Sequence, residues 1–250
     1  MAVDDDLRSG LTDAAPAEFH RLSAVERDRF LTHGERLIRR SHWEGARDVA
    51  VTDEMVFTVA AHAALLAAGF DERTEPFLNV KPIVLHGRTI ITRGVFAGPA
   101  PGLVTSGPQY LAGQSGHGRG PVLLDWQTVQ RNVADPGLGV NVVYHEFAHK
   151  LDQLDGDADG MPPLPDRAAR KAWTQTLGTN YRRLRRRGSD GLVRAYGATN
   201  PAEYFAVTSE LFFTRPTDLR DRLPRVYDRL ADFYRQDPAA RATRPAPRGV

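Results

Sequence analysis

The chain has 250 residues, of which 41% are apolar and 26% are charged, and it contains no cysteine. This composition is too apolar for a disordered chain, has too little glycine and proline for a fibrous protein, and excludes a disulfide scaffold. The formal net charge is only +2, and the densest basic run, residues 182–187, fits a solvated helix face better than a nucleic-acid surface.

The apolar runs and the first residues bear on where the protein works. No apolar run reaches the roughly 18 to 20 residues that a membrane-spanning helix needs. The chain begins with an acidic segment, whereas a secretory signal begins with basic residues followed by an apolar stretch. We therefore expect a cytoplasmic protein without a membrane segment.

Two amphipathic helices are predicted in the first third of the chain. Apolar residues recur at about helical spacing from Ala17 to Arg40, and more densely from Asp53 to Leu66. Thr52 precedes two acidic residues at the start of the second pattern, which is typical of a capped helix. His62 lies within this second helix, and we interpret it as a core residue.

A small mixed sheet is predicted between Val80 and Asp125. Its strands are indicated by three short β-prone runs bounded by glycine and proline, at residues 83–85, 89–92 and 122–124. Seven glycines fall within residues 97–121, which predicts a long loop beside the sheet.

The helical period returns after Asn141 and continues through most of the remaining chain. Further helices are predicted near residues 166–186, 201–213 and 218–235, and a disordered tail is predicted over 237–250. Helices, then a short sheet, then helices again predict an α+β fold, with residues 1–236 forming one domain.

The segment from His145 to His149 carries the clearest chemical signal. It reads His-Glu-Phe-Ala-His, an H-E-x-x-H pattern inside an apolar helical stretch. Residues four apart lie one above the other on a helix, so His145 and His149 can both bind one metal ion. Glu146 lies on the adjoining flank, where its carboxylate can act as a general base without ligating the ion.

A catalytic zinc needs a third protein ligand, and three carboxylates are candidates for that position. Asp155 follows His149 by six residues, where one H-E-x-x-H family has its last ligand. That geometry relies on a glycine three residues after the second histidine, and Asp152 stands there instead.

Glu203 and Glu210 are the other two candidates. They are seven residues apart on one predicted helix and therefore share a face. Glu203 also fits a capping box that begins at Asn200, with proline at the first helical position. Because unpaired carboxylates would be costly in this apolar stretch, we favour a ligand and its close partner over two helix caps.

These motifs together resemble the Mlc titration factor A family of bacterial zinc peptidases, whose catalytic core is similar to that of anthrax lethal factor. The resemblance extends over about residues 17–238, and the two central motifs are highly specific. It is carried by the segments Asn141 to Asp152, Tyr196 to Val207, Ser209 to Phe213, Val51 to Met55, Gly120 to Trp126 and Phe233 to Pro238.

The resemblance implies that His145, His149 and Glu203 ligate zinc and that Glu146 is the base. It also implies that Tyr196, seven residues before the glutamate ligand, faces the metal, where its hydroxyl can donate a hydrogen bond to an oxyanion. A tyrosine that merely packs at the helix entry is the alternative. Thermolysin-like enzymes have an aspartate four residues after the glutamate ligand, and this chain has valine there, so another group must orient the histidine.

We therefore expect a mostly helical, zincin-like (gluzincin) metallopeptidase that hydrolyses peptide bonds, with aminopeptidases among the candidate activities. The peptide or protein substrate would lie extended along an edge strand at residues 122–125. The alternative, implied by the family name, is a regulatory protein that binds and sequesters a transcriptional repressor, with hydrolysis secondary. Neither interpretation involves direct binding of nucleic acid or a membrane.

Overall fold

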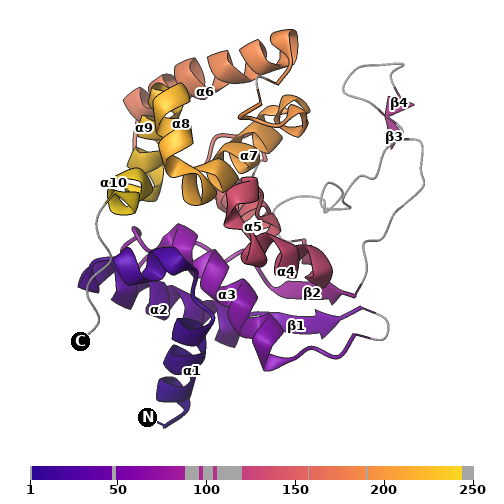
Figure 1. Ribbon diagram of the computed structural model, residues 1–250, viewed down its shortest axis with the longest axis vertical. Helices are drawn as coiled ribbons and strands as arrows, with labels where there is room; N and C mark the ends of the chain where they lie inside the picture. The colour runs from indigo at the N-terminus through magenta and orange to yellow at the C-terminus, as the bar shows by residue number, and fades with distance from the viewer. Residues whose placement is uncertain are drawn as a thin grey trace.

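A computed structural model describes residues 2–46, 49–87, 96–97, 104–105, 120–156, 158–189 and 191–243. The fold is mostly helical, with a small sheet near the middle of the sequence (Figure 1). The N-terminal half contains α1 (Ala2–Asp13), η1 (Ala17–Arg21), α2 (Ala24–Arg40), β1 (His42–Gly45), α3 (Asp53–Ala67), β2 (Pro82–His86), β3 (Phe96–Ala97), β4 (Val104–Thr105) and β5 (Val122–Asp125). It is followed by α4 (Trp126–Ala134), η3 (Pro136–Leu138), α5 (Val142–Asp152), η4 (Gln153–Asp155), α6 (Arg167–Arg187), η5 (Ala195–Ala198), α7 (Pro201–Thr214), α8 (Pro216–Arg222), α9 (Pro224–Tyr234) and α10 (Pro238–Ala242).

The main sheet is parallel, so the prediction of a mixed sheet was wrong in this respect. Its three strands lie in the order β1-β2-β5, and both neighbouring pairs run parallel. Parallel neighbours need a crossover connection, and α3 provides it between β1 and β2. β1 was not predicted because its sequence, His-Trp-Glu-Gly, has no apolar alternation. β3 and β4 form a separate antiparallel pair, while the β-prone run at 89–92 and most of the glycine-rich segment lie outside the described residues.

The first predicted helix is divided, and the division has a local cause. Ser23 accepts a hydrogen bond from the Glu26 amide, and the Glu26 carboxylate accepts one from the Ser23 amide. This capping box starts α2 at Ala24, so the pattern from Ala17 gives the short helix η1 and then α2. The second helix is confirmed at Asp53–Ala67, and Thr52 caps it through the Met55 amide.

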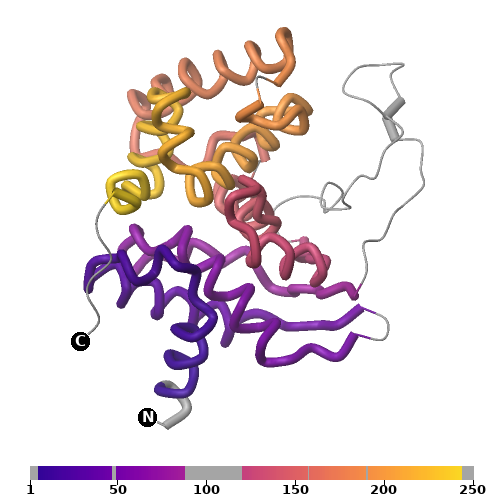
Figure 2. The backbone as a smooth tube through the Cα atoms, viewed as in Figure 1, coloured from indigo at the N-terminus to yellow at the C-terminus, as the bar shows by residue number. Residues whose placement is uncertain are grey.

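Helices α5 and α7 form the centre of the molecule. The two helices pack against each other, and α5 also contacts α3 and β5. In Figures 1 and 2, α5 lies between the indigo and purple N-terminal elements and the orange and yellow helices α6 to α10. Nearly all of α7 is buried, from Ala202 to Phe213, as is typical of a helix with apolar residues on every side.

The last part of the chain differs from the prediction in two places. Pro224 ends α8 and starts α9, because proline cannot donate the backbone hydrogen bond that a continuous helix needs. The tail was expected to begin at Asp237, but Asp237 caps α10, in which Ala239 and Arg241 are buried. Residues 237–242 therefore form part of the folded structure, and the remainder of the predicted tail, from residue 244, lies outside the described residues.

The segment around α10 joins the two ends of the sequence. The Gln236 side-chain amide donates hydrogen bonds to the carbonyls of Leu65 and Leu66 at the end of α3. Arg241 pairs with Glu26 at 2.8 Å, on the carboxylate that also caps α2. These contacts attach the C-terminal helices directly to the N-terminal ones. None of the helices in the described ranges is both long and apolar enough to cross a membrane.

Candidate metal centre

Helix α5 positions the three residues of the H-E-x-x-H motif. Asn141 is its N-cap, and the Asn141 side-chain oxygen accepts hydrogen bonds from the amides of Val143 and Tyr144. His145 and Glu146 are buried, and His149 is only partly exposed. The motif therefore lies in the first three turns of a capped helix whose other face packs in the core.

The two histidines and Glu203 come together at one point. The Nε2 atoms of His145 and His149 are 3.2 Å apart. The Glu203 carboxylate approaches both, with Oε2 at 3.0 Å from His145 Nε2 and Oε1 at 3.5 Å from His149 Nε2. One ligand atom from each residue lies within 4.8 Å of the others, an arrangement that could hold a metal ion.

Glu210 supports His145 from the side opposite this cluster. Its Oε1 lies 2.8 Å from His145 Nδ1, and its Oε2 accepts a hydrogen bond of 2.8 Å from the Asn141 amide. Arg194 also donates to Oε1 through Nη2. Glu210 is completely buried, so one carboxylate fixes both the imidazole ring and the start of α5. A carboxylate behind a ligating histidine is the usual arrangement at metal sites.

The hydrogen bonds determine which atoms of the cluster can bind a cation. Because the Glu210 carboxylate only accepts, His145 holds a proton on Nδ1, and Nε2 is the atom that can ligate a cation when the cation displaces its proton. Glu203 Oε2 is buried and has no partner in hydrogen-bond geometry, although it is close to that nitrogen. Two imidazoles and a carboxylate are a common donor set for a catalytic zinc, so the residues fit the ion.

Charge coupling shifts the pKa values of these groups. Burial opposes the charged form of His145, but the carboxylates of Glu203 and Glu210 outweigh it and raise the pKa of the imidazole to about 10. Burial also acts on Glu203, yet the two histidines hold its pKa far below the usual range. The pKa of Glu146 is raised, mainly by burial and against the effect of both histidines. A raised pKa suits a proton acceptor that must later release the proton.

Tyr196 lies in the short helix η5, next to the cluster. Its ring centroid is 5.9 Å from that of His145. Burial raises the pKa of its hydroxyl, and the nearby carboxylates of Glu203 and Glu146 raise it further. The Arg194 guanidinium lies 5.5 Å from the centre of the Tyr196 ring, within cation–π range. The phenol therefore remains protonated beside the two carboxylates.

Asp155, the alternative third ligand six residues after His149, lies apart from the cluster. Asp155 is exposed at the end of η4 and is not among the residues whose ligand atoms converge. Asp152, at the position where a glycine would be needed, continues the helix with φ −59° and ψ −40°. Its buried carboxylate accepts a hydrogen bond from the Gly160 amide, and burial raises its pKa to about 7. Asp152 thus anchors the loop after α5.

Gly160 allows this loop to meet the start of α7. It has φ +80°, and a Cβ atom there would lie 2.4 Å from the Pro201 carbonyl oxygen. Asn200 caps α7 through the Glu203 amide at 2.8 Å, so the capping interpretation holds for the Glu203 backbone. The Glu203 side chain instead extends to the histidines.

Sequence reasoning missed Arg194 and Lys150. Arg194 reaches Glu210 across 16 residues of sequence, and its position two residues before Tyr196 is the only local signal that could have drawn attention to it. The Lys150 ammonium group donates to the Gly120 carbonyl at 2.7 Å, linking α5 to the segment just before β5. Burial lowers the pKa of this lysine, and the Glu146 carboxylate partly opposes that shift.

Comparison with known proteins identifies the class. Residues 2–235 match the model of the glucose-regulated metallo-peptidase M90 family. The chain belongs to this metallopeptidase family.

Relatives of known name agree with this assignment. Mlc titration factor A of Edwardsiella ictaluri is 37% identical over 227 residues, which cover 86% of this chain and 82% of that relative. Mlc titration factor A of Serratia proteamaculans is 43% identical over 149 residues, 57% of this chain and 55% of the relative. The resemblance found in the sequence is therefore confirmed at the level of the family.

Proposed function

We propose that the chain is a zinc-dependent metallopeptidase, with zinc held by His145, His149 and Glu203. The observation that carries this proposal is the convergence of two imidazole Nε2 atoms and one carboxylate within 4.8 Å. Glu210 supports it, since a second carboxylate orients the His145 ring. The family match to metallopeptidases points in the same direction.

The side chains around the cluster can share the work of peptide hydrolysis. A zinc ion, when bound, lowers the pKa of water and polarises a carbonyl group. Glu146 accepts the proton of the attacking water and passes it to the leaving amine. Tyr196 donates its phenolic hydrogen to the oxygen on which negative charge develops. Arg194 keeps Glu210, and through it His145, in place.

The sheet supplies a place for an extended substrate. Among the strands of the described residues, β5 lies at one end of the order β1-β2-β5, and α5 packs against it. An edge strand offers main-chain donors and acceptors to a peptide. We propose that the substrate pairs with Val122–Asp125, beside the motif helix.

The direct test is Glu146→Gln. An amide cannot accept the proton, so hydrolysis of a mixed peptide library should fall by at least about 100-fold. Zinc content, measured on the same sample, should stay at the wild-type level because the ligands are unchanged. Glu54→Gln, the same change at an exposed position on α3, is the matched control and should leave both unaltered. Wild-type turnover in Glu146→Gln would overturn the proposed mechanism.

A second candidate function follows from the names of the relatives. Proteins called Mlc titration factor A are named for titrating Mlc, and we propose sequestration of a repressor of that kind as the alternative role. Binding of a purified Mlc-type repressor by both wild type and Glu146→Gln would show that this role is independent of catalysis. Absence of binding to either protein would remove the alternative.

A further inference from the structure

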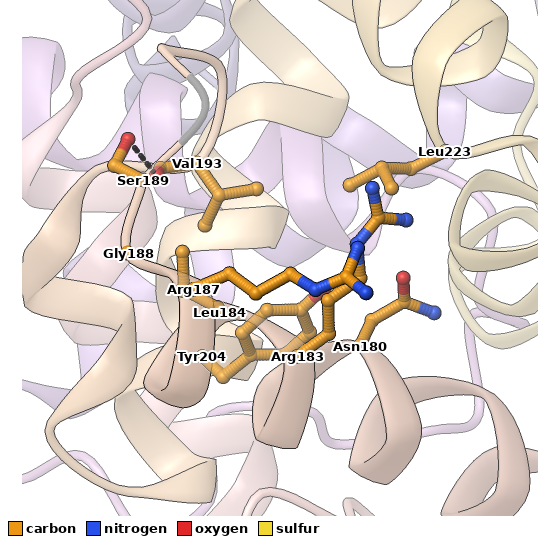
Figure 3. A pocket seen from close by; sticks show the side chains of 9 residues that line it. All are labelled: Asn180, Arg183, Leu184, Arg187, Gly188, Ser189, Val193, Tyr204 and Leu223. Atoms are coloured by element: carbon orange, nitrogen blue, oxygen red, sulfur yellow. Dashed lines mark hydrogen bonds between the residues drawn. The ribbon is translucent and has the colours of Figure 1, made fainter.

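A separate cavity lies beside the C-terminal end of α6. It has a volume of about 140 Å³ and is formed by the last turns of α6, the segment after it, and α7 (Figure 3). Asn180, Arg183 and Arg187 line its polar side, while Leu184, Val193 and Tyr204 contribute non-polar surface. None of the residues of the metal cluster lines this cavity.

The two arginines are placed together by helical spacing. Arg183 and Arg187 are four residues apart, so they project from one face of α6. In Figure 3 their guanidinium groups extend into the same space, beside the Asn180 amide. Arg185 and Arg186 belong to the same basic run but do not line the cavity. The macrodipole favours basic residues in the last turn of any helix, but it does not explain why two of them converge.

The positive charge at this cavity has no neutralising group among the described residues. No Asp or Glu of that part of the chain lines the cavity, and none forms an ion pair with Arg183 or Arg187. Guanidinium groups stay charged at all physiological pH values. Two such groups facing one space suit an oxyanion, because their N–H donors match carboxylate and phosphate geometry.

The size and walls of the cavity define the rest of the ligand. One water molecule needs roughly 10 to 15 Å³ of cavity volume measured in this way. The cavity volume of about 140 Å³ is therefore larger than an inorganic anion alone requires. The Tyr204 ring, Leu184 and Val193 provide non-polar surface for a small organic group. We propose that this cavity binds a small organic oxyanion, with Arg183 and Arg187 holding a phosphate or carboxylate group and the non-polar wall covering its body.

The cavity borders the metal centre through neighbouring residues in the sequence. Val193 precedes Arg194, which holds Glu210, and Tyr204 follows Glu203. A ligand in the cavity would therefore contact the immediate neighbours of two residues of the metal centre. Binding itself does not depend on the proposed peptidase activity, and the test below measures binding alone.

Isothermal titration calorimetry on the full chain tests the site with phenyl phosphate and benzoate. We expect saturable binding of one molecule per chain for at least one of them, and the tighter of the two identifies the headgroup. Uncharged benzyl alcohol should not bind, and inorganic phosphate should bind more weakly than phenyl phosphate. Arg183→Gln and Arg187→Gln should each weaken binding by at least about tenfold, as expected for the loss of a charged hydrogen-bonding partner.

Arg186→Gln is the matched control. It removes the same charge from the same exposed end of α6, outside the cavity, and should leave the affinity within about twofold of wild type. Thermal unfolding of all three variants should show that they remain folded. Equal loss of affinity in Arg186→Gln, or no saturable binding of either anion at millimolar concentration, would overturn the proposal. Equal affinity for inorganic and phenyl phosphate would refute the role of the non-polar wall.

Discussion

The variant Glu210→Gln tests whether Glu210 orients the proposed ligand His145, because it leaves the three proposed ligands themselves unchanged. The carboxylate accepts from His145 Nδ1, from Arg194 and from the Asn141 amide, and it has no exposed surface. Glutamine has almost the same shape but offers only one acceptor oxygen. Its NH₂ group must then face either the Asn141 N–H group or the donors of His145 and Arg194. In either orientation, two buried hydrogen-bond donors face each other and one hydrogen bond is lost.

The expected size of the effect follows from these contacts. Removing a partner that orients a ligating histidine typically lowers metal affinity by roughly 10- to 100-fold, which corresponds to about 1.4 to 2.7 kcal/mol. Arg194 also loses its charged partner, but its side chain is 35% exposed and water can solvate the guanidinium, so the metal-free protein should lose about 1 to 2 kcal/mol of unfolding free energy. Loss of the helix-cap contact at Asn141 acts in the same direction.

Zinc affinity, measured by competition with a chromophoric chelator, and urea unfolding of the metal-free protein check the two effects. Asp152→Asn is the control, since it alters another buried carboxylate at the other end of α5 without touching a ligand. It should change stability and lower zinc affinity much less than Glu210→Gln does, because Asp152 acts on His149 through charge and does not orient its ring. Unchanged zinc affinity in folded Glu210→Gln would refute the view that this carboxylate fixes His145.

Three further predictions concern the ligand, the tyrosine and the buried aspartate. Glu203→Ala should empty the zinc site, whereas Asp155→Ala should leave it filled; metal analysis showing the reverse would favour the shorter-spaced ligand. Tyr196→Phe should lower kcat by about 100- to 1000-fold with little change in KM or zinc content, and an unaltered kcat would make Tyr196 a packing residue. Because the pKa of Asp152 rises from 3.8 to about 7 on folding, the wild type should lose stability relative to Asp152→Asn between pH 4 and pH 7. The loss should be of the order of 4 kcal/mol by urea unfolding, and parallel pH profiles would contradict it.

Local signals in the sequence predicted most of the helices. Thr52, Asp166 and Asn200 each cap a helix that begins at the next residue, close to where apolar spacing placed it. The convergence of His145 and His149 was likewise predictable, because it depends on one helical turn. Where local signals conflicted with periodicity, at Ser23 and at Pro224, the capping box and the proline determined the helix boundaries.

Contacts between segments far apart in the sequence could not be predicted from capping signals or apolar spacing. Arg194 meets Glu210 only because η5 packs against α7, and no pattern within the sequence specifies that packing. The parallel arrangement of β1, β2 and β5 likewise depends on how α3 and the later segment cross over the sheet. For Glu203, the sequence favoured a metal ligand over a helix cap, and it could not show that the residue can serve in both ways. The structure shows that its amide takes part in the cap while its carboxylate faces the histidines.

The attachment of the C-terminal segment to the first helices affects how the chain can be shortened or tagged. Gln236 bonds to the carbonyls of Leu65 and Leu66, and Arg241 shares Glu26 with the start of α2. A chain cut after residue 235 would keep every residue of the metal cluster but would lose these contacts. Those carbonyls would lose their Gln236 donor, and Glu26 would lose its arginine. Proteolytic nicking at this point would therefore loosen the N-terminal helices first, so an affinity tag is best attached beyond residue 243.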